Sequence, residues 1–175
     1  MIENLNNISK TLILSTLVIV VIQFIFASYK VNGDSMNPTL DHGDRVLVLK
    51  LNYINIPIIN KKIIINNPKK DSIIAFQKAD EGIELVKRVI ALPPEKIDIK
   101  NRTVFINDEI QERGIGVTFP HSDFPVILEN NCIFVMGDNR NSSNDSRRFG
   151  CVPIENIDGQ VAMRVWPINK FKLFR

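Results

Sequence analysis

Three short stretches of the sequence carry side chains that could together form a nucleophile, its base and the groups that hold the base. Ser35 lies in a turn-forming stretch, residues 32–40, and Lys87 lies in a run of β-forming residues, 85–90. A serine hydroxyl is a poor nucleophile until a base removes its proton, and a neutral lysine can be that base. The third stretch, residues 137–147, is rich in polar side chains that could hold the lysine amine. We therefore interpret Ser35 as a nucleophile and Lys87 as its general base.

A lysine serves as a base only when its amine is neutral. The unperturbed pKa is about 10.4, so at pH 8 fewer than about one lysine in a hundred is uncharged. Burial among apolar groups can lower that pKa by roughly two units, at a cost of about 2.7 kcal/mol against the charged form. Neighbours on a strand face opposite sides, so we expect Lys87 to be buried and Arg88 to reach solvent. His42 and His121 lie in polar loops, and we interpret both as solvated residues.

An uncharged apolar run precedes the serine. Residues 11–28 contain no charged side chain, and as a helix they would span about 27 Å, close to the thickness of a hydrocarbon core. A cleaved signal peptide is the alternative, but Ile25 or Phe26 would then stand where the cleavage site needs a small residue. We predict a short tail over 1–10, an uncleaved transmembrane anchor over 11–28 and a folded domain over 29–175.

The rest of the chain has the pattern of a β protein. Short runs rich in β-branched residues alternate with turn-rich gaps, and the sequence contains no long amphipathic helix and no internal repeat. We predict an all-β domain of antiparallel sheets after one N-terminal transmembrane helix. Its strands are expected at 45–49, 72–76, 86–90, 96–99, 103–106, 126–128, 132–136 and 160–165, with a hairpin turn at 107–109.

Other parts of the sequence mainly exclude functions. The net charge of +3 is mild, and no nucleic-acid-recognition motif is present. Cys132 and Cys151 lack metal-ligand spacing. We expect no nucleic acid, no metal and no cofactor.

Residues 53–70 could form a hairpin whose lysines face lipid headgroups, although we favour a surface excursion of biased composition. A disulfide is permitted outside the cytoplasm, but we favour free thiols because Cys132 lies in an apolar strand.

The three stretches together resemble the successive signature boxes of type I signal peptidases. The matching segments are 33–40, 87–90 and 137–150, in the family's order, and residues 69–76 resemble the family's intervening strand. The resemblance implies a membrane-bound serine endopeptidase with a Ser/Lys dyad. Such an enzyme removes N-terminal signal peptides from exported preproteins and cuts after small residues.

The resemblance also implies roles for the residues around the dyad. Ser143 would orient the Lys87 amine through a hydrogen bond. Asp145 and Arg147 would form a supporting ion pair, since residues two apart in an extended segment share a side and a guanidinium can bind a carboxylate through two bonds. An extended substrate could add as a strand beside the site. Apolar residues that flank the dyad would wall shallow pockets for the small side chains one and three positions before the cut: Val31, Met36, Leu40, Leu85 and Val86.

Two positions depart from the family's pattern. Some relatives carry a serine two residues before the nucleophile, whose hydroxyl helps to bind the oxyanion, and here that residue is Gly33. The Ser35 backbone N–H is then the available donor, and a lost donor can cost about 3 kcal/mol. Residues 91–95 read Ala-Leu-Pro-Pro-Glu where the family usually has Gly-Leu-Pro-Gly-Asp. Pro94 excludes a turn with positive φ at that position.

The family analogy also implies a location and partners. Residues 1–10 would be cytoplasmic, and the catalytic domain would lie on the extracytoplasmic side of the cell membrane. Partners would be exported preproteins, the lipid bilayer and, transiently, the secretion translocon. One alternative is a self-cleaving Ser/Lys regulator of the repressor type, but such proteins are soluble and the apolar run 11–28 argues against it. Another is an anchored β domain that binds peptides, with Ser35 and Lys87 purely structural.

Overall fold

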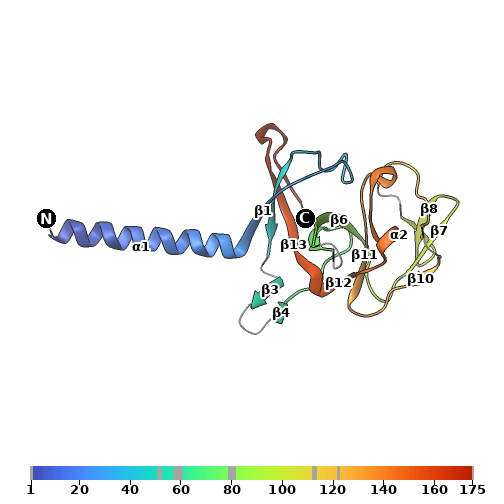
Figure 1. Cartoon of the computed structure of the whole chain (residues 1–175), viewed down its shortest axis with the longest axis horizontal. Coiled ribbons are helices and arrows are strands. Elements are labelled where there is room, and N and C mark those ends of the chain that lie inside the picture. The colour runs from blue at the N-terminus through green and yellow to red at the C-terminus, as the bar shows by residue number, and fades with distance from the viewer. Residues whose placement is uncertain are drawn as a thin grey trace.

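A long N-terminal helix leads into a domain made mostly of antiparallel strands (Figure 1). The computed structural model describes residues 2–50, 53–56, 61–78, 82–111, 114–121 and 123–174. In the described part of the chain every pair of named strands is antiparallel. The prediction of an antiparallel β domain after one helix is confirmed.

The helix α1 (Ile2–Ile25) projects away from the domain (Figure 1). Its segment Asn7–Ile25 is long and apolar enough to cross a membrane once, and it is not buried against the rest of the chain. The helix ends three residues earlier than the apolar run. Residues 26–28 begin the strand β1 (Phe26–Lys30), because their backbone groups pair with β2 (Arg45–Leu49) instead of continuing the helix.

The main sheet carries Lys87 on one of its strands, and Ser35 lies in the loop that follows β1. Its strand order is β1-β2-β13-β5-β6-β11-β12, with β14 paired to β13. Most of these strands agree with the runs of β-branched residues, while β1, β12 and β14 were not predicted. Beyond β1 and β2, the strands are β5 (Ile73–Gln77), β6 (Glu84–Ala91), β11 (Cys132–Met136), β12 (Val152–Pro153), β13 (Ile157–Trp166) and β14 (Lys172–Leu173).

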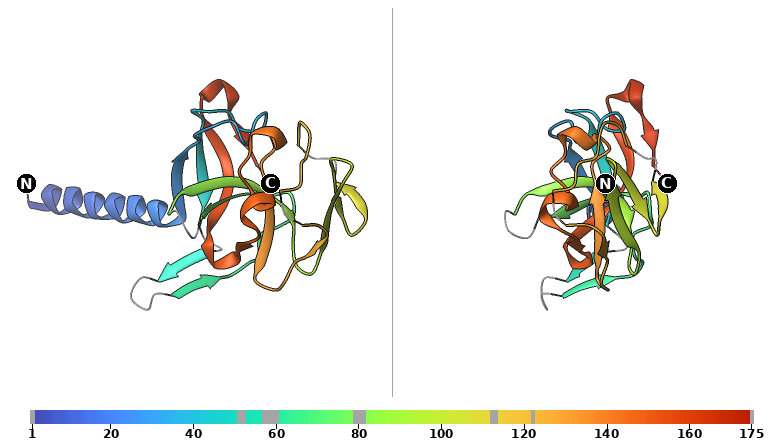
Figure 2. Two further views of the ribbon diagram at one scale, coloured as in Figure 1. Left: turned by 45° about the vertical axis from the view of Figure 1, so that its right-hand side comes forward. Right: turned by 90° about the vertical axis from the view of Figure 1, so that its right-hand side faces the viewer.

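A second sheet packs at the end of the domain remote from α1 (Figures 1 and 2). Its order is β10 (Val126–Ile127), β7 (Lys96–Lys100), β8 (Thr103–Ile106) and β9 (Glu109–Gln111). The predicted hairpin turn is present, with φ of 51° at Asn107 and 70° at Asp108, as a tight two-residue connection requires. The two sheets share a core, since buried residues of β6 and β11 pack with those of β7 and β8.

Residues 53–64 contain a hairpin, formed by β3 (Tyr53–Ile56) and β4 (Lys61–Ile64). The hairpin therefore replaces the surface excursion that we favoured. It projects from the domain on the side from which α1 leaves (Figure 2). The side chains of Lys61 and Lys62, which we expected could face lipid headgroups, lie outside the described residues.

The two cysteines form a disulfide, and the expectation of free thiols was wrong. Cys132 on β11 bonds to Cys151, with an S–S distance of 2.13 Å. The antiparallel pairing of β11 with β12 places Cys132 opposite Pro153 and so brings Cys151 near it. A short helix, α2 (Ser146–Phe149), lies at the end of the third signature stretch, just before Cys151. The disulfide therefore closes a loop around that entire stretch.

The turn after β6 accommodates the unusual Pro93-Pro94 pair. The peptide bond between the two prolines is cis. The Glu95 N–H donates to the Leu92 carbonyl at 2.8 Å, and the Leu92 N–H donates to Glu95 Oε2 at 2.8 Å. Glu95 Oε1 also pairs with Lys70 Nζ at 2.8 Å. These contacts stabilise the turn, and Pro94 does not adopt a positive φ in it.

Candidate active site

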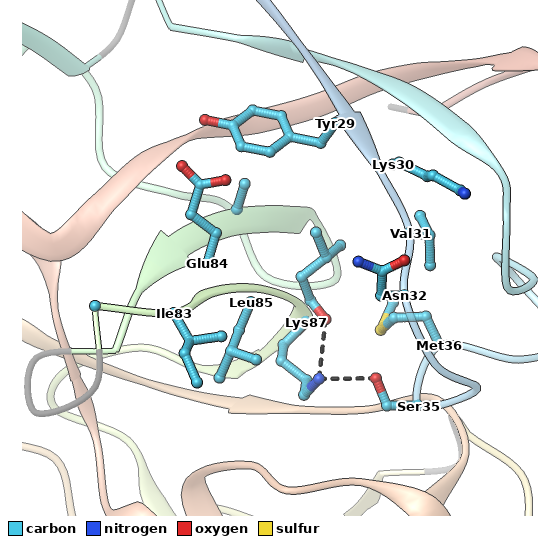
Figure 3. Close-up of a pocket in the computed structure, with 13 residues that line it drawn as sticks. Tyr29, Lys30, Val31, Asn32, Ser35, Met36, Ile83, Glu84, Leu85 and Lys87 are labelled. Carbon is cyan, nitrogen blue, oxygen red and sulfur yellow. Dashed lines mark hydrogen bonds between the residues drawn. The ribbon is translucent and has the colours of Figure 1, made fainter.

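Ser35 and Lys87 meet although 52 residues separate them in the chain. Ser35 lies in the loop after β1, and Lys87 lies on β6. Lys87 Nζ donates a 2.8 Å hydrogen bond to Ser35 Oγ and a 3.2 Å bond to the carbonyl oxygen of Val86 (Figure 3). This is the distance over which a proton can pass between the two groups.

The surroundings of Lys87 favour the neutral amine. The residue is only 3% exposed, and burial lowers its pKa from 10.5 to about 8, while the charge of Asp145 partly offsets that effect. At pH 7 about a tenth of such amines are neutral, compared with fewer than one in a thousand for an unperturbed lysine. The amine is thus suited to accept a proton near physiological pH.

Arg88 is buried as well, which contradicts the expectation that it reaches solvent. Its guanidinium binds the carboxylate of Asp138 in a bidentate manner, at 2.7 Å from Nε and 2.6 Å from Nη2. It also donates to the Asp71 carbonyl at 2.6 Å. Strand alternation does not put either residue in water here, because residues 87–91 of β6 are covered on both faces. Asp138 thereby joins the third signature stretch to β6, a role that the sequence did not suggest.

Asp145 and Arg147 form a buried bidentate ion pair. Arg147 Nε and Nη2 each lie 2.8 Å from a carboxylate oxygen of Asp145. The backbone is not extended across both residues as we expected. Asp145 is instead the N-cap of α2 and accepts from the Arg147 N–H at 3.2 Å. Burial raises the pKa of Asp145, but the hydrogen bonds and charge of Arg147 outweigh this, so the pKa lies below its usual range.

Ser143 lies beside this ion pair rather than on the lysine. Its hydroxyl is buried and makes no hydrogen bond to a described residue, although it lies near enough to the Asp145 carboxylate to help lower its pKa. Lys87 Nζ directs its two described hydrogen bonds to Ser35 and Val86 instead. The expected hydrogen bond from Ser143 to Lys87 is therefore not formed in this structure.

The third stretch also holds the backbone of the nucleophile. The Asn139 N–H donates to the Ser35 carbonyl oxygen at 2.9 Å. Next to this contact, Gly137 donates its N–H to Asp145 Oδ2 at 3.0 Å. A Cβ atom on Gly137 would overlap both the Ser143 hydroxyl and the Ser35 carbonyl oxygen. A glycine before Asp138 was the only sequence signal for this close packing.

The backbone before Ser35 is held by a histidine that we had interpreted as solvated. His42 is exposed, but its Nδ1 accepts a 3.0 Å hydrogen bond from the Gly33 N–H. Gly33 adopts φ of 87°, a conformation that favours glycine. Gly33 therefore contributes no hydroxyl to an oxyanion site and its N–H is already occupied.

A groove begins at the dyad. Its cavity measures about 430 Å³. Four of the predicted pocket residues, Val31, Met36, Leu85 and Val86, line it, but Leu40 does not. Leu40 is fully buried and packs in the core beneath the site. The remaining lining residues beside Ser35 and Lys87, which the sequence did not single out, are Tyr29, Lys30, Asn32, Ala75, Gly82, Ile83 and Glu84 (Figure 3).

The arrangement can support hydrolysis of a peptide bond without a metal. It supplies a hydroxyl nucleophile, a buried amine within proton-transfer distance and a groove beside them. Among the described residues, no group of three or more His, Cys, Asp or Glu side chains could hold a metal ion.

Comparison with known proteins gives consistent matches. Residues 5–166 match the family model described as signal peptidase, peptidase S26. A probable signal peptidase I-1 from Synechocystis is 34% identical over 149 residues, which cover 85% of this chain and 75% of the relative. Signal peptidase IB from Staphylococcus aureus is 31% identical over 169 residues, covering 86% and 83%. The crystal structure of a signal peptidase I from Enterococcus faecalis, at 26% identity, aligns with a TM-score of 0.45 over 55% of this chain and 97% of that one.

Proposed function

The chain belongs to the signal peptidase family, peptidase S26, and we propose that Ser35 and Lys87 are the nucleophile and general base of its serine endopeptidase reaction. Members with signal peptidase I activity remove signal peptides from preproteins. The observation that carries the assignment is the 2.8 Å contact between Lys87 Nζ and Ser35 Oγ. Burial lowers the pKa of the same lysine to about 8, so the amine is available as a base.

The reaction proceeds in two halves. The neutral Lys87 amine accepts the Ser35 hydroxyl proton as Oγ attacks the carbonyl carbon of the cleaved bond. The resulting ammonium gives that proton to the leaving amine, and the amino-terminal part of the substrate stays on Ser35 as an ester. Water then attacks the ester with Lys87 again as the base, which frees the signal peptide and regenerates the hydroxyl.

Supporting groups would stabilise the charges that appear during these steps. The Ser35 backbone N–H is our candidate oxyanion donor. The negative charge of Asp145, held by Arg147, favours the Lys87 ammonium that forms in the transition state. We assign the buried Ser143 hydroxyl to orient the amine during turnover, when Lys87 no longer bonds to a protonated Ser35.

The strands that border the groove suit an extended substrate. β1 is the edge strand of the main sheet. Residues 84–87 of β6 pair with β5, whereas β11 pairs only with residues 88–91. Each strand thus has an edge beside the groove that no other described strand pairs with, and a peptide strand can hydrogen-bond to such an edge. The apolar walls formed by Val31, Met36, Leu85 and Val86 would accept the small side chains before the cut.

The fold supports a single-pass anchor with the catalytic domain on the extracytoplasmic side. α1 can cross a membrane once, so residues near its start would be the cytoplasmic tail. The Cys132–Cys151 disulfide suits an oxidising compartment. Partners would be exported preproteins, the surrounding bilayer and, transiently, the secretion translocon.

Cleavage of a preprotein by the full-length chain in detergent micelles tests the dyad. We expect cleavage after a small residue, lost in Ser35→Ala and in Lys87→Ala. Lys69→Ala is a matched control, because Lys69 is exposed and does not line the groove. Circular dichroism should show that all variants are folded. Cleavage retained in Lys87→Ala would refute the dyad.

A further inference from the structure

The groove that begins at the dyad ends at two polar side chains, Tyr29 and Glu84. Glu84 and Lys87 lie three residues apart on β6, which is roughly 10 Å along a strand. Between them the groove is walled by Leu85 and Val86. Figure 3 shows the Glu84 carboxylate turned toward the Tyr29 phenol at the end away from Ser35. The groove therefore changes from apolar to acidic with distance from the nucleophile.

Among the residues that the structure describes, none is a counter-ion to this acidic end. Glu84 is the one acidic residue among the described residues that line the groove, and its carboxylate forms no ion pair with any described residue. Lys30 also lines the groove, but its ammonium points away from Glu84 (Figure 3). Burial raises the pKa of Tyr29 to about 12, with added contributions from the charges of Asp158 and Glu84. The phenol thus stays neutral beside two carboxylates.

We propose that Glu84, with Tyr29, forms a specificity site that favours a basic side chain four or five residues before the cleaved bond. This rests on the proposed function, in which the apolar walls take the small residues one and three positions before the cut. An extended peptide advances about 3.3 Å per residue. The residues that follow in the same direction therefore lie beside Glu84, where a cation gains a partner and an anion meets a like charge.

The expected preference for a basic over an acidic substrate side chain is modest, because Glu84 is exposed and solvent screens its charge. Exposed ion pairs change a rate or binding constant by about two- to fivefold. A preference of this origin should shrink as salt increases, since about 0.5 M salt screens exposed charges over a few ångströms. A preference that arose from side-chain shape alone would not respond to salt.

Charge reversal tests the proposal. The substrates are preproteins that differ only by Lys, Gln or Glu at the fourth and fifth positions before the cut, and kcat/KM is measured for each. For the unaltered enzyme we expect Lys to exceed Glu by about threefold to tenfold at low salt. Glu84→Gln should remove most of this ratio, and Glu84→Lys should invert it. Glu109→Lys makes the same charge change at an exposed site on β9, outside the groove, and should leave the ratio unchanged.

Failure of the proposed function and failure of the specificity site give different results. If the Gln substrate is not cleaved, or is cleaved equally by Ser35→Ala, the proposed function fails. If its cleavage depends on Ser35 but the ratio of Lys to Glu substrates is the same in the unaltered enzyme, Glu84→Gln and Glu84→Lys, the specificity site is refuted. Thermal unfolding of each variant checks that a changed ratio comes from folded enzyme.

Discussion

The amide N–H of Asn139 donates a 2.9 Å hydrogen bond to the carbonyl oxygen of Ser35. The stretch that holds the proposed base therefore also holds the nucleophile's backbone. Asp138 binds Arg88, the residue after Lys87, and Asp145 contributes charge to Lys87 itself. One loop, closed by the Cys132–Cys151 disulfide, thus fixes both members of the dyad relative to each other.

This packing predicts that Gly137→Ala inactivates the enzyme more than it unfolds it. The added Cβ would overlap the Ser143 hydroxyl and the Ser35 carbonyl oxygen, so the loop or the nucleophile must move. We expect kcat for preprotein cleavage to fall by at least about a hundredfold, as displacement of reacting groups by about 1 Å can cause. Ser142→Ala, at an exposed position in the same loop, is the control. Equal activity of the two variants would contradict the assigned packing.

The pKa of Lys87 predicts how activity depends on pH. Because burial lowers that pKa to about 8, the neutral base becomes more abundant as pH rises through 8 and is fully formed above it. We expect kcat/KM to increase about tenfold per pH unit below 8 and to level off above it. The pH profile of cleavage measures this directly. A profile without an inflection between pH 7 and 9 would argue against Lys87 as the base.

That Ser35 and Lys87 lie together could be predicted because the residue types around them are distinctive. Three features are rarely found together in one sequence: a serine in a turn after an apolar run, a lysine in an apolar strand, and a long polar stretch. Strands with several β-branched residues could also be predicted from the sequence, as at β2, β8 and β11. Two-residue strands such as β12 and β14 have no such signal, because long-range pairing alone defines them.

The contacts that position the dyad could not be predicted, because they depend on what covers each element. Strand alternation placed Arg88 in water, yet both faces of that part of β6 are buried and Arg88 binds Asp138. Leu40 was predicted to face substrate but completes the core beneath the site. His42 reaches the Gly33 N–H only because the loop between β1 and β2 folds back on itself. None of these outcomes follows from a local pattern.

The buried lysine predicts that Lys87→Met stabilises the protein while abolishing cleavage. Lys87 has a pKa of about 8 in the folded protein, compared with 10.5 for an unperturbed lysine, so below pH 8 folding disfavours its charged form by on the order of 3 kcal/mol. This penalty declines as pH rises from 8 to 10.5, and it is absent above that range. Urea unfolding in detergent should therefore show the methionine variant to be more stable at pH 7, with a smaller gain at pH 10. A destabilised variant at pH 7 would contradict this account.

Asp145→Asn should separate the structural role of the buried ion pair from its electrostatic role. The change leaves the Arg147 guanidinium buried with a weaker partner, and breaking such a pair costs about 3–5 kcal/mol of stability. It also removes the negative charge that raises the pKa of Lys87. We therefore expect the variant that remains folded at low temperature to lose kcat but to show its pH inflection below 8. Unfolding measurements report the first effect and the pH profile reports the second. An inflection that stays in place would show that Asp145 acts on the fold alone.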